Sequence, residues 1–251
     1  MAKVIMIPAR FGSSRLPGKP LLDIAGQPMV VRVAEAARDA GFDRVVVATD
    51  DRRILEAVEQ AGHNAVMTRS DHPSGTDRLQ EAADQLSLSA QDIVVNLQGD
   101  EPLMPLENLR QVAQLLEDHL EADVATLYEP ITSIEQRNNP NAVKLVQRLD
   151  GQVLYFSRSA IPHDRDSSES DDSRLWKRHI GLYAYRKSAL DAFVAWPESQ
   201  LERLEKLEQL RFMEQGGVIV AAEAAQSVPA GVDTQADLDT VRHWFNTRGS
   251  S

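Results

Sequence analysis

The stretch KVIMIPARFGSSRLPGKP, residues 3–20, decides the fold because it joins a short apolar run to a glycine-rich cationic turn. Residues 3–8 are mostly aliphatic, which predicts a β-strand. A loop follows to about residue 27, and the pattern PMVVRVAEAARDAG from Pro28 predicts a helix that ends at Gly41. The amino end is therefore predicted to form a strand, a loop and a helix.

The same alternation repeats along the first half of the chain. Strands are predicted at 43–49, 64–69 and 92–97, and helices at 51–62, 76–87 and 106–120. Strands that are separated by helices must pair mostly in parallel, and the helices then cover both faces of the sheet. The sequence therefore predicts a doubly wound α/β sheet. Ligands of such sheets bind beyond the carboxyl ends of the strands.

After residue 122 the predicted strands follow one another more closely, at 122–128, 142–149, 152–158 and 177–186. This spacing predicts a small mixed or antiparallel extension at about 122–186 within a single domain, 1–251. Helices at 187–196 and 201–215, a strand at 218–223 and a closing helix from about Thr234 complete the pattern. Residues 161–174 are rich in Ser and Asp, which predicts a mobile surface loop.

Composition excludes several classes of protein. The 251 residues carry a formal net charge of −11, which disfavours a nucleic-acid partner. Cysteine is absent, so disulfides, thiol nucleophiles and cysteine-bound metals are excluded. The first residues contain too few apolar side chains for a secretory signal, and no run approaches the roughly 18 apolar residues of a membrane span. We expect a cytoplasmic protein without membrane insertion.

The turn at 10–20 is the first candidate site. Residues 1–22 hold four basic side chains and no acid, and Arg10, Arg15 and Lys19 of this segment follow the first strand. Such groups, with Gly12 and Gly18 allowing close backbone approach, suit a triphosphate. The turn does not fit the Walker loop, because five residues separate the two glycines and Pro follows the lysine, and no GxGxxG occurs. A solvated basic loop is the alternative.

The spacing alone does not decide whether three further side chains bind a ligand or only support the fold. Asp100 follows an apolar strand in QGDEP and either holds Mg²⁺ with substrate phosphates or belongs to an ordinary Gly-Asp turn. Asp233 precedes a helix, where a helix cap is the simpler interpretation. His179 lies in a strand pattern, where a half-buried structural histidine is more common than a ligand.

Eight segments together resemble the cytidylyltransferases that activate 3-deoxy-D-manno-octulosonate (Kdo), an acidic sugar. They are IPARFGSSRLPGKPL, VATDD, HPSGTDR, VNLQGDEP, YFSRSAIPHDRD, KRHIGLYAYR, LEKLEQLRFMEQG and GVDTQADL, and they run from the first strand to the last helix. The resemblance implies a fold of the nucleotide-diphosphosugar-transferase type. It also implies the reaction CTP + Kdo → CMP-Kdo + pyrophosphate, with Mg²⁺ as cofactor and a homodimer as the assembly.

The resemblance also assigns roles to residues of this chain. It makes Asp100 and Asp233 the metal ligands and, with Lys19 and Arg15, the catalytic set. The implied nucleotide-binding residues are Arg10, Ser13, Arg15, Lys19, Ser74, Gly75 and Arg78. The implied sugar-binding residues are Gln98, Arg158, His179, Tyr183, Glu208 and Gln209.

Two alternative functions stay open at this point. The sugar could be another 2-keto acid such as 8-amino-Kdo or sialic acid, since one polar contact can decide between related sugars. Alternatively, the fold could serve as a nucleotide-binding regulator without catalysis.

Overall fold

The computed structural model describes residues 1–12, 16–166 and 175–248. Of the loop predicted at 161–174, residues 167–174 lie outside this range, and 161–166 form no helix or strand. In the described part of the chain, no helix is both long enough and apolar enough to cross a membrane.

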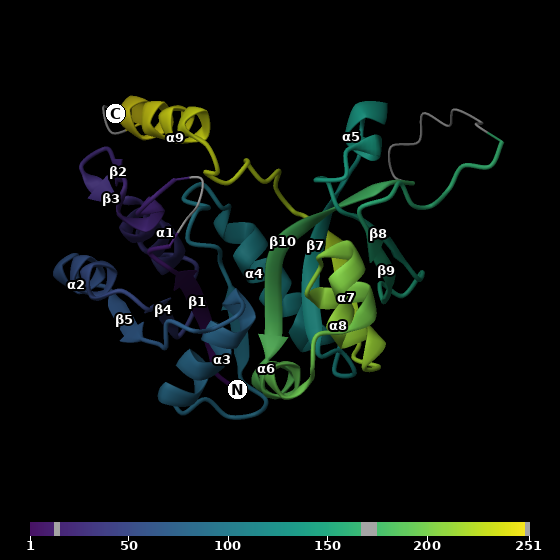
Figure 1. Ribbon diagram of the computed structural model, residues 1–251, viewed down its shortest axis with the longest axis horizontal. Helices are drawn as coiled ribbons and strands as arrows, with labels where there is room; N and C mark the ends of the chain where they lie inside the picture. The colour runs from purple at the N-terminus through teal and green to yellow at the C-terminus, as the bar shows by residue number, and fades with distance from the viewer. Residues whose placement is uncertain (13–15, 167–174, 249–251) are drawn as a thin grey trace.

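A nine-stranded sheet forms the centre of the molecule (Figure 1). Its main path runs β11-β7-β10-β6-β1-β4-β5, and β8 and β9 branch from β10. The strands are β1 (Lys3–Ala9), β4 (Arg44–Thr49), β5 (Asn64–Met67), β6 (Ile93–Asn96), β7 (Val124–Pro130), β8 (Lys144–Gln147), β9 (Val153–Ser157), β10 (Lys177–Arg186) and β11 (Ile219–Glu223). A separate hairpin holds β2 (Asp23–Ile24) and β3 (Gln27–Pro28).

The pairing confirms a mostly parallel, doubly wound sheet. β1 pairs in parallel with β4 and β6, β4 with β5, and β7 with β11. Among the strands of the described residues, β10 alone runs antiparallel to both of its neighbours in the main path, β6 and β7. The region predicted as an extension therefore supplies two strands of the central sheet, and β8 and β9 project from it as an antiparallel pair.

Helices cover both faces of this sheet. They are α1 (Met29–Arg38), α2 (Arg52–Gln60), α3 (Gly75–Gln85), α4 (Leu106–Asp118), α5 (Ile134–Asn138), α6 (Lys187–Ala195), α7 (Gln200–Glu205), α8 (Gln209–Glu214) and α9 (Gln235–Arg248). Side chains of β1 alternate between two cores. Ile5 and Ile7 join the core beneath α1, α2 and α4, whereas Val4 and Met6 join the core beneath α3, α6 and α8.

The prediction of one helix at 201–215 was wrong. Lys206 adopts a left-handed conformation with φ of 54°, so α7 ends there and α8 begins at Gln209. The apolar spacing of Leu204, Leu207 and Leu210 continues through the break, which is why periodicity did not reveal it. The consequence is that Glu208 lies in a turn between two short helices.

The last helix is tied to the amino-terminal half. The segment after β11 crosses from the half that carries β7 and β10 to the half that carries β1, where α9 lies against β2 (Figure 1). Val232, Leu238 and Val241 are buried in a small core with Ile24 and Met29. This crossing returns the C-terminal segment to the half of the molecule that holds the cationic turn.

Candidate active site

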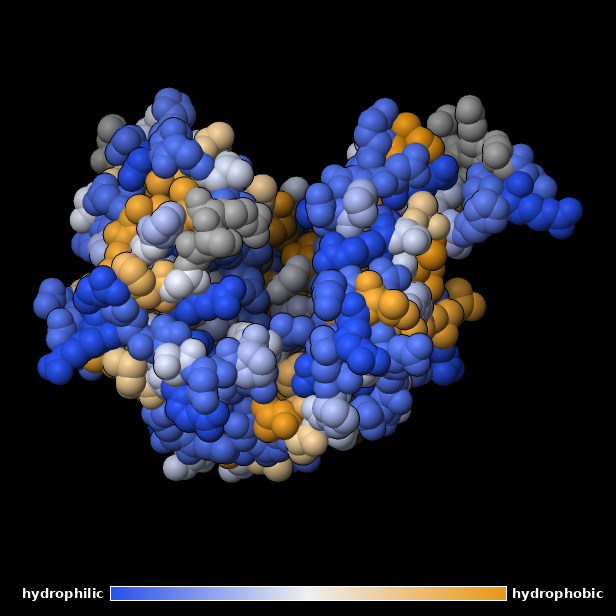
Figure 2. Space-filling view, viewed as in Figure 1, coloured by the Kyte–Doolittle hydropathy of each residue, from blue (hydrophilic) through white to orange (hydrophobic). Residues whose placement is uncertain are grey.

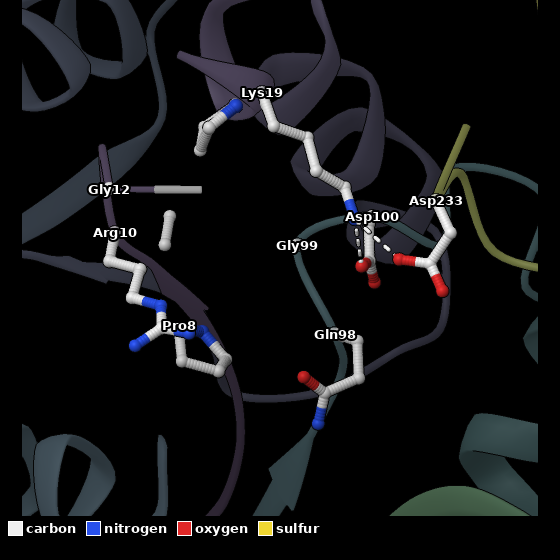
Figure 3. A pocket seen from close by; sticks show the side chains of 10 residues that line it. Pro8, Arg10, Gly12, Lys19, Gln98, Gly99, Asp100 and Asp233 are labelled. Carbon is white, nitrogen blue, oxygen red and sulfur yellow. Dashed lines mark hydrogen bonds and ion pairs between the residues drawn. The ribbon is translucent and has the colours of Figure 1, made fainter. Parts of the chain in front are cut away.

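Lys19 joins two aspartates that are distant in the sequence. It begins the short 3₁₀ helix η1 (Lys19–Leu21), directly after Gly18, whose φ of 67° favours glycine. Its ammonium nitrogen lies 2.6 Å from Oδ2 of Asp100 and 3.1 Å from Oδ1 of Asp233 (Figure 3). The two carboxylates therefore converge on one cation.

Asp100 reaches this position because the turn after β6 packs tightly against the end of β1. A Cβ atom on Gly99 would lie 2.9 Å from the carbonyl oxygen of Pro8, so only glycine fits at that position. Asp233 is fixed by the crossing segment, where the amide of Val232 donates to the carbonyl of Asp100 at 2.8 Å. Close backbone packing, rather than side-chain contact alone, thus aligns the two aspartates.

A cavity of about 270 Å³ opens beside these groups. It is lined by Pro8, Ala9, Arg10, Gly12, Lys19, Pro20, Gln98, Gly99, Asp100 and Asp233. Arg10 and Gln98 border the space from the side opposite Lys19 (Figure 3), and the molecular surface is hollowed between its two halves (Figure 2). The structure thus gathers five predicted site residues, whereas Ser13 and Arg15 fall outside the described residues.

The predicted nucleotide segment lies at the amino end of α3. Ser74 caps this helix, and its hydroxyl accepts from the amide of Asp77 and donates to its carboxylate. Gly75 approaches Pro8 of the cavity wall, since a Cβ there would lie 3.9 Å from the proline ring. Arg78 is buried and donates to Asp50 at 2.8 Å. Arg78 therefore anchors α3 to the turn after β4.

Several predicted sugar residues form a second group along β10. The ring centroid of His179 lies 5.0 Å from that of Phe156 and 5.2 Å from that of Tyr183. Glu208 accepts a 2.9 Å hydrogen bond from Thr76 of α3. Burial raises the pKa of Glu208, although hydrogen bonds from Thr76 and a neighbouring serine oppose the shift. Burial likewise raises the pKa of the Tyr183 hydroxyl.

Arg158 and Gln209 do not line the cavity around Lys19. Gln209 is buried at the start of α8. Arg158 donates to the carbonyls of Glu205, Lys206 and Pro140 at 2.6, 3.2 and 3.1 Å. In this arrangement Arg158 joins the α7–α8 turn to the loop before β8.

One buried ionisable group near the site was missed from the sequence. Glu101 follows Asp100, and burial together with the charge of Asp100 raises its pKa to about 8, against the opposing effect of Arg178. Among the described atoms, Oε2 of Glu101 and Nε of Arg178 are buried without a hydrogen-bond partner. The acidic pair in QGDEP was visible, but nothing in its spacing distinguished a buried glutamate from a solvated one.

The two aspartates fit a divalent cation. The Lys19 ammonium shows that a positive charge is accommodated between them. Within the described ranges, no group of three or more His, Asp or Glu side chains is arranged around a common point for a metal. Two carboxylates completed by substrate phosphates are the usual ligand set of Mg²⁺.

His179 should make the protein sensitive to acid. Burial, followed by the charge of Arg178, lowers the pKa of His179 to about 3, whereas an unfolded histidine titrates near 6.5. Between these values the unfolded chain binds the additional proton, so the free energy of unfolding falls as pH falls. We expect His179→Gln to remove about 1–2 kcal/mol of the stability loss between pH 7 and pH 5.

Urea unfolding of both proteins at the two pH values measures this difference. His163→Gln, at an exposed position, is the matched control and should behave as the wild type. An equal stability loss in wild type and His179→Gln would contradict the prediction.

The chain matches a family profile described as "Cytidylyltransferase" over residues 4–223. The 3-deoxy-manno-octulosonate cytidylyltransferase of Hahella chejuensis is 54% identical over 246 residues, which covers 96% of both chains. The enzyme of the same name from Acinetobacter baumannii is 50% identical over 245 residues, covering 96% of this chain and 97% of its own.

Solved structures agree with these sequence relatives. A CMP:2-keto-3-deoxy-manno-octonic acid synthetase complexed with CTP superposes with a TM-score of 0.90 at 44% identity, covering 99% of this chain and 100% of its own. A Leptospira borgpetersenii cytidylyltransferase has a TM-score of 0.64 at 19% identity, covering 98% and 87%, and supports the fold alone. The chain belongs to the cytidylyltransferase family, within the group of the 3-deoxy-manno-octulosonate cytidylyltransferases.

Proposed function

We propose that the chain transfers CMP from CTP to the anomeric hydroxyl of Kdo, giving CMP-Kdo and pyrophosphate. The observation that carries this proposal is the convergence of Lys19, Asp100 and Asp233 at the carboxyl end of a parallel sheet. The names of the relatives supply the substrates, and the similar solved structure is a complex with CTP.

The chemistry requires groups that hold anions rather than a covalent nucleophile. The anomeric oxygen of Kdo forms a bond to the α-phosphorus while the bond to pyrophosphate breaks, and the hydroxyl proton is released. Such a step depends on alignment and on neutralising charge at the phosphoryl oxygens. Lys19 and Arg10 border the cavity and can donate to those oxygens. The α3 start, with Ser74 and Gly75, lies beside the same wall and would hold the cytidine.

Asp100 and Asp233 would hold Mg²⁺, which supplies charge neutralisation at phosphate and a lower pKa for a bound hydroxyl. Their carboxylates are partly exposed, at 33% and 48%, so an ion can reach them from the cavity. Lys19 must then share or leave its place between them.

The sugar would extend from this centre toward β10. Gln98 borders the cavity. His179 and Tyr183 on β10, and Glu208 in the α7–α8 turn, belong to the neighbouring half of the molecule. Polar groups of this kind reject a sugar that covers them and leaves them unpaired. We assign the sugar contacts to these residues with Arg158 and Gln209.

A pyrophosphate assay tests the proposal. The purified chain is supplied with CTP and Kdo, 8-amino-Kdo or sialic acid, each with Mg²⁺ or with EDTA. We expect release with Kdo and Mg²⁺, and none with EDTA. Release with sialic acid alone would favour a different sugar-acid cytidylyltransferase, and CTP binding without any release would favour a regulator.

The proposal also includes a homodimer that works in the cytoplasm, where CTP is made. Exposed apolar side chains lie on the β8–β9 hairpin and on α7, namely Leu149, Leu154 and Leu204. Hydrophobic surface gathers on this side of the molecule (Figure 2), and β9 is an edge strand. An exposed apolar edge is a place where a second chain can pair.

Leu154→Lys should weaken this dimer at least about tenfold, because a charge would be buried at the interface. Sedimentation velocity over a range of protein concentrations measures the dissociation constant. Leu120→Lys, at a residue that is 83% exposed in the α4–β7 turn, is the control. A monomeric wild type, or equal effects of the two variants, would rule out this interface.

A further inference from the structure

Lys144 is a fully buried lysine that the proposed chemistry does not use. It begins β8, its exposed fraction is 0%, and its register partners are Ser157 of β9 and Arg178 of β10. Its ammonium donates to the carbonyls of Asn139 and Arg158 at 2.9 and 2.5 Å. Burying an ammonium costs several kcal/mol, so such a group is usually retained for a specific contact.

The main contact of Lys144 is the backbone of Arg158. Glu205 holds the other side of the same residue, since the amide of Arg158 donates to Oε2 of Glu205 at 2.9 Å. The second carboxylate oxygen of Glu205 accepts from the hydroxyl of Ser157 at 2.6 Å. Both main-chain groups of Arg158 are therefore held by charged side chains, one cationic and one anionic.

This arrangement joins two segments that the proposed function assigns to the sugar. The Arg158 side chain donates to the carbonyls of Glu205 and Lys206, where α7 ends. Glu208 follows two residues later and contacts α3. Displacing the backbone at Arg158 would therefore also shift the turn that carries Glu208.

The same residues are connected to the histidine on β10. The amide of His179 donates to the carbonyl of Val143 at 2.8 Å, directly before Lys144. Phe156, which precedes Ser157, packs its ring against His179. Lys144 is thus connected, directly or through neighbouring residues, to three segments that carry predicted sugar residues. These segments are the end of β9, the α7–α8 turn and β10.

We propose that Lys144 is a positioning residue for the acidic sugar, because it fixes the backbone of Arg158 relative to the α7–α8 turn. This inference rests on the proposed function. Lys144 itself does not touch the substrate, since its ammonium is enclosed and bonded to carbonyls. Burial lowers its pKa, and the negative charge of Glu205 opposes that shift and favours the ammonium form.

The test separates binding of the two substrates. Lys144→Met removes the charge and keeps the length of the side chain, and we expect its KM for Kdo to rise at least about tenfold. The KM for CTP should stay within about twofold and kcat within about threefold, because the cavity around Lys19 is formed by other elements.

Arg186→Met is the matched control. Arg186 is also a buried cation that donates to main-chain carbonyls, those of Leu116, His119 and Ala122, but it lies at the opposite end of β10. It should lower the melting temperature without raising the ratio of the two KM values. A purely structural role of Lys144 would give the same pattern as this control.

Glu205→Gln keeps the inference testable if Lys144→Met does not fold, and it should raise the KM for Kdo at least about threefold. Wild-type turnover of Kdo with an unchanged KM in the variants that fold would overturn the inference alone. Absence of turnover by the wild type would instead overturn the proposed function and this inference with it.

Discussion

Asp100→Asn is expected to lower the rate of pyrophosphate release by about 10²–10³-fold while leaving the fold intact. Asn has the same shape but lacks the charge that would hold a divalent cation. The main-chain bond from Val232 to the carbonyl of residue 100 does not depend on the side chain, and Lys19 keeps Asp233 as a partner. The measurement is kcat at saturating CTP, Kdo and Mg²⁺, together with the melting temperature.

A matched control exists elsewhere in the molecule. Lys187 also lies between two aspartates, 2.6 Å from Asp84 and 2.8 Å from Asp191, on α3 and α6. Asp84→Asn makes the same chemical change there and should leave kcat unchanged. Normal turnover in Asp100→Asn would remove Asp100 from the metal role.

The main features of the sheet, and Lys19 and Asp100 of its site, could be predicted from the sequence pattern, whereas Asp233 was assigned to the site only by the family resemblance. Periodicity located the first strands, and the rule that ligands bind beyond parallel strands pointed to both Lys19 and Asp100. It could not join Asp233 to them, since a cap before a helix was the simpler interpretation. That contact depends on α9 packing against Ile24 of β2 and Met29 of α1, and on the crossing segment bonding to Asp100.

The α7–α8 turn shows why other features could not be predicted. Its break has no Gly or Pro, and the leucine spacing on both sides favours one helix. The interactions that stabilise the break come from outside the segment. Glu205 receives two hydrogen bonds from β9 and its following residue, and Arg158 donates to the carbonyls at the end of α7. Such tertiary contacts outweigh local propensity.

Lys19→Ala should separate catalysis from cation binding. We expect kcat to fall by about 10²–10³-fold, because the ammonium is placed to stabilise charge that develops on phosphate during the reaction. The KM for Kdo should change by less than about threefold. Lys187→Ala, which removes the other lysine held by two aspartates, is the control for both measurements.

The same substitution should strengthen binding of Mg²⁺ in the absence of nucleotide. The ammonium lies 2.6 and 3.1 Å from the two carboxylates, where it competes with any divalent cation. Removing it leaves two negative charges side by side, and a cation relieves their repulsion. Titration calorimetry with Mg²⁺ should therefore show a lower dissociation constant in Lys19→Ala than in the wild type. A misfolded variant would lose both turnover and Mg²⁺ binding. Tighter Mg²⁺ binding combined with slower turnover therefore supports a cation site that the two aspartates share. Weaker Mg²⁺ binding in a folded Lys19→Ala would mean that the two aspartates do not bind the metal together.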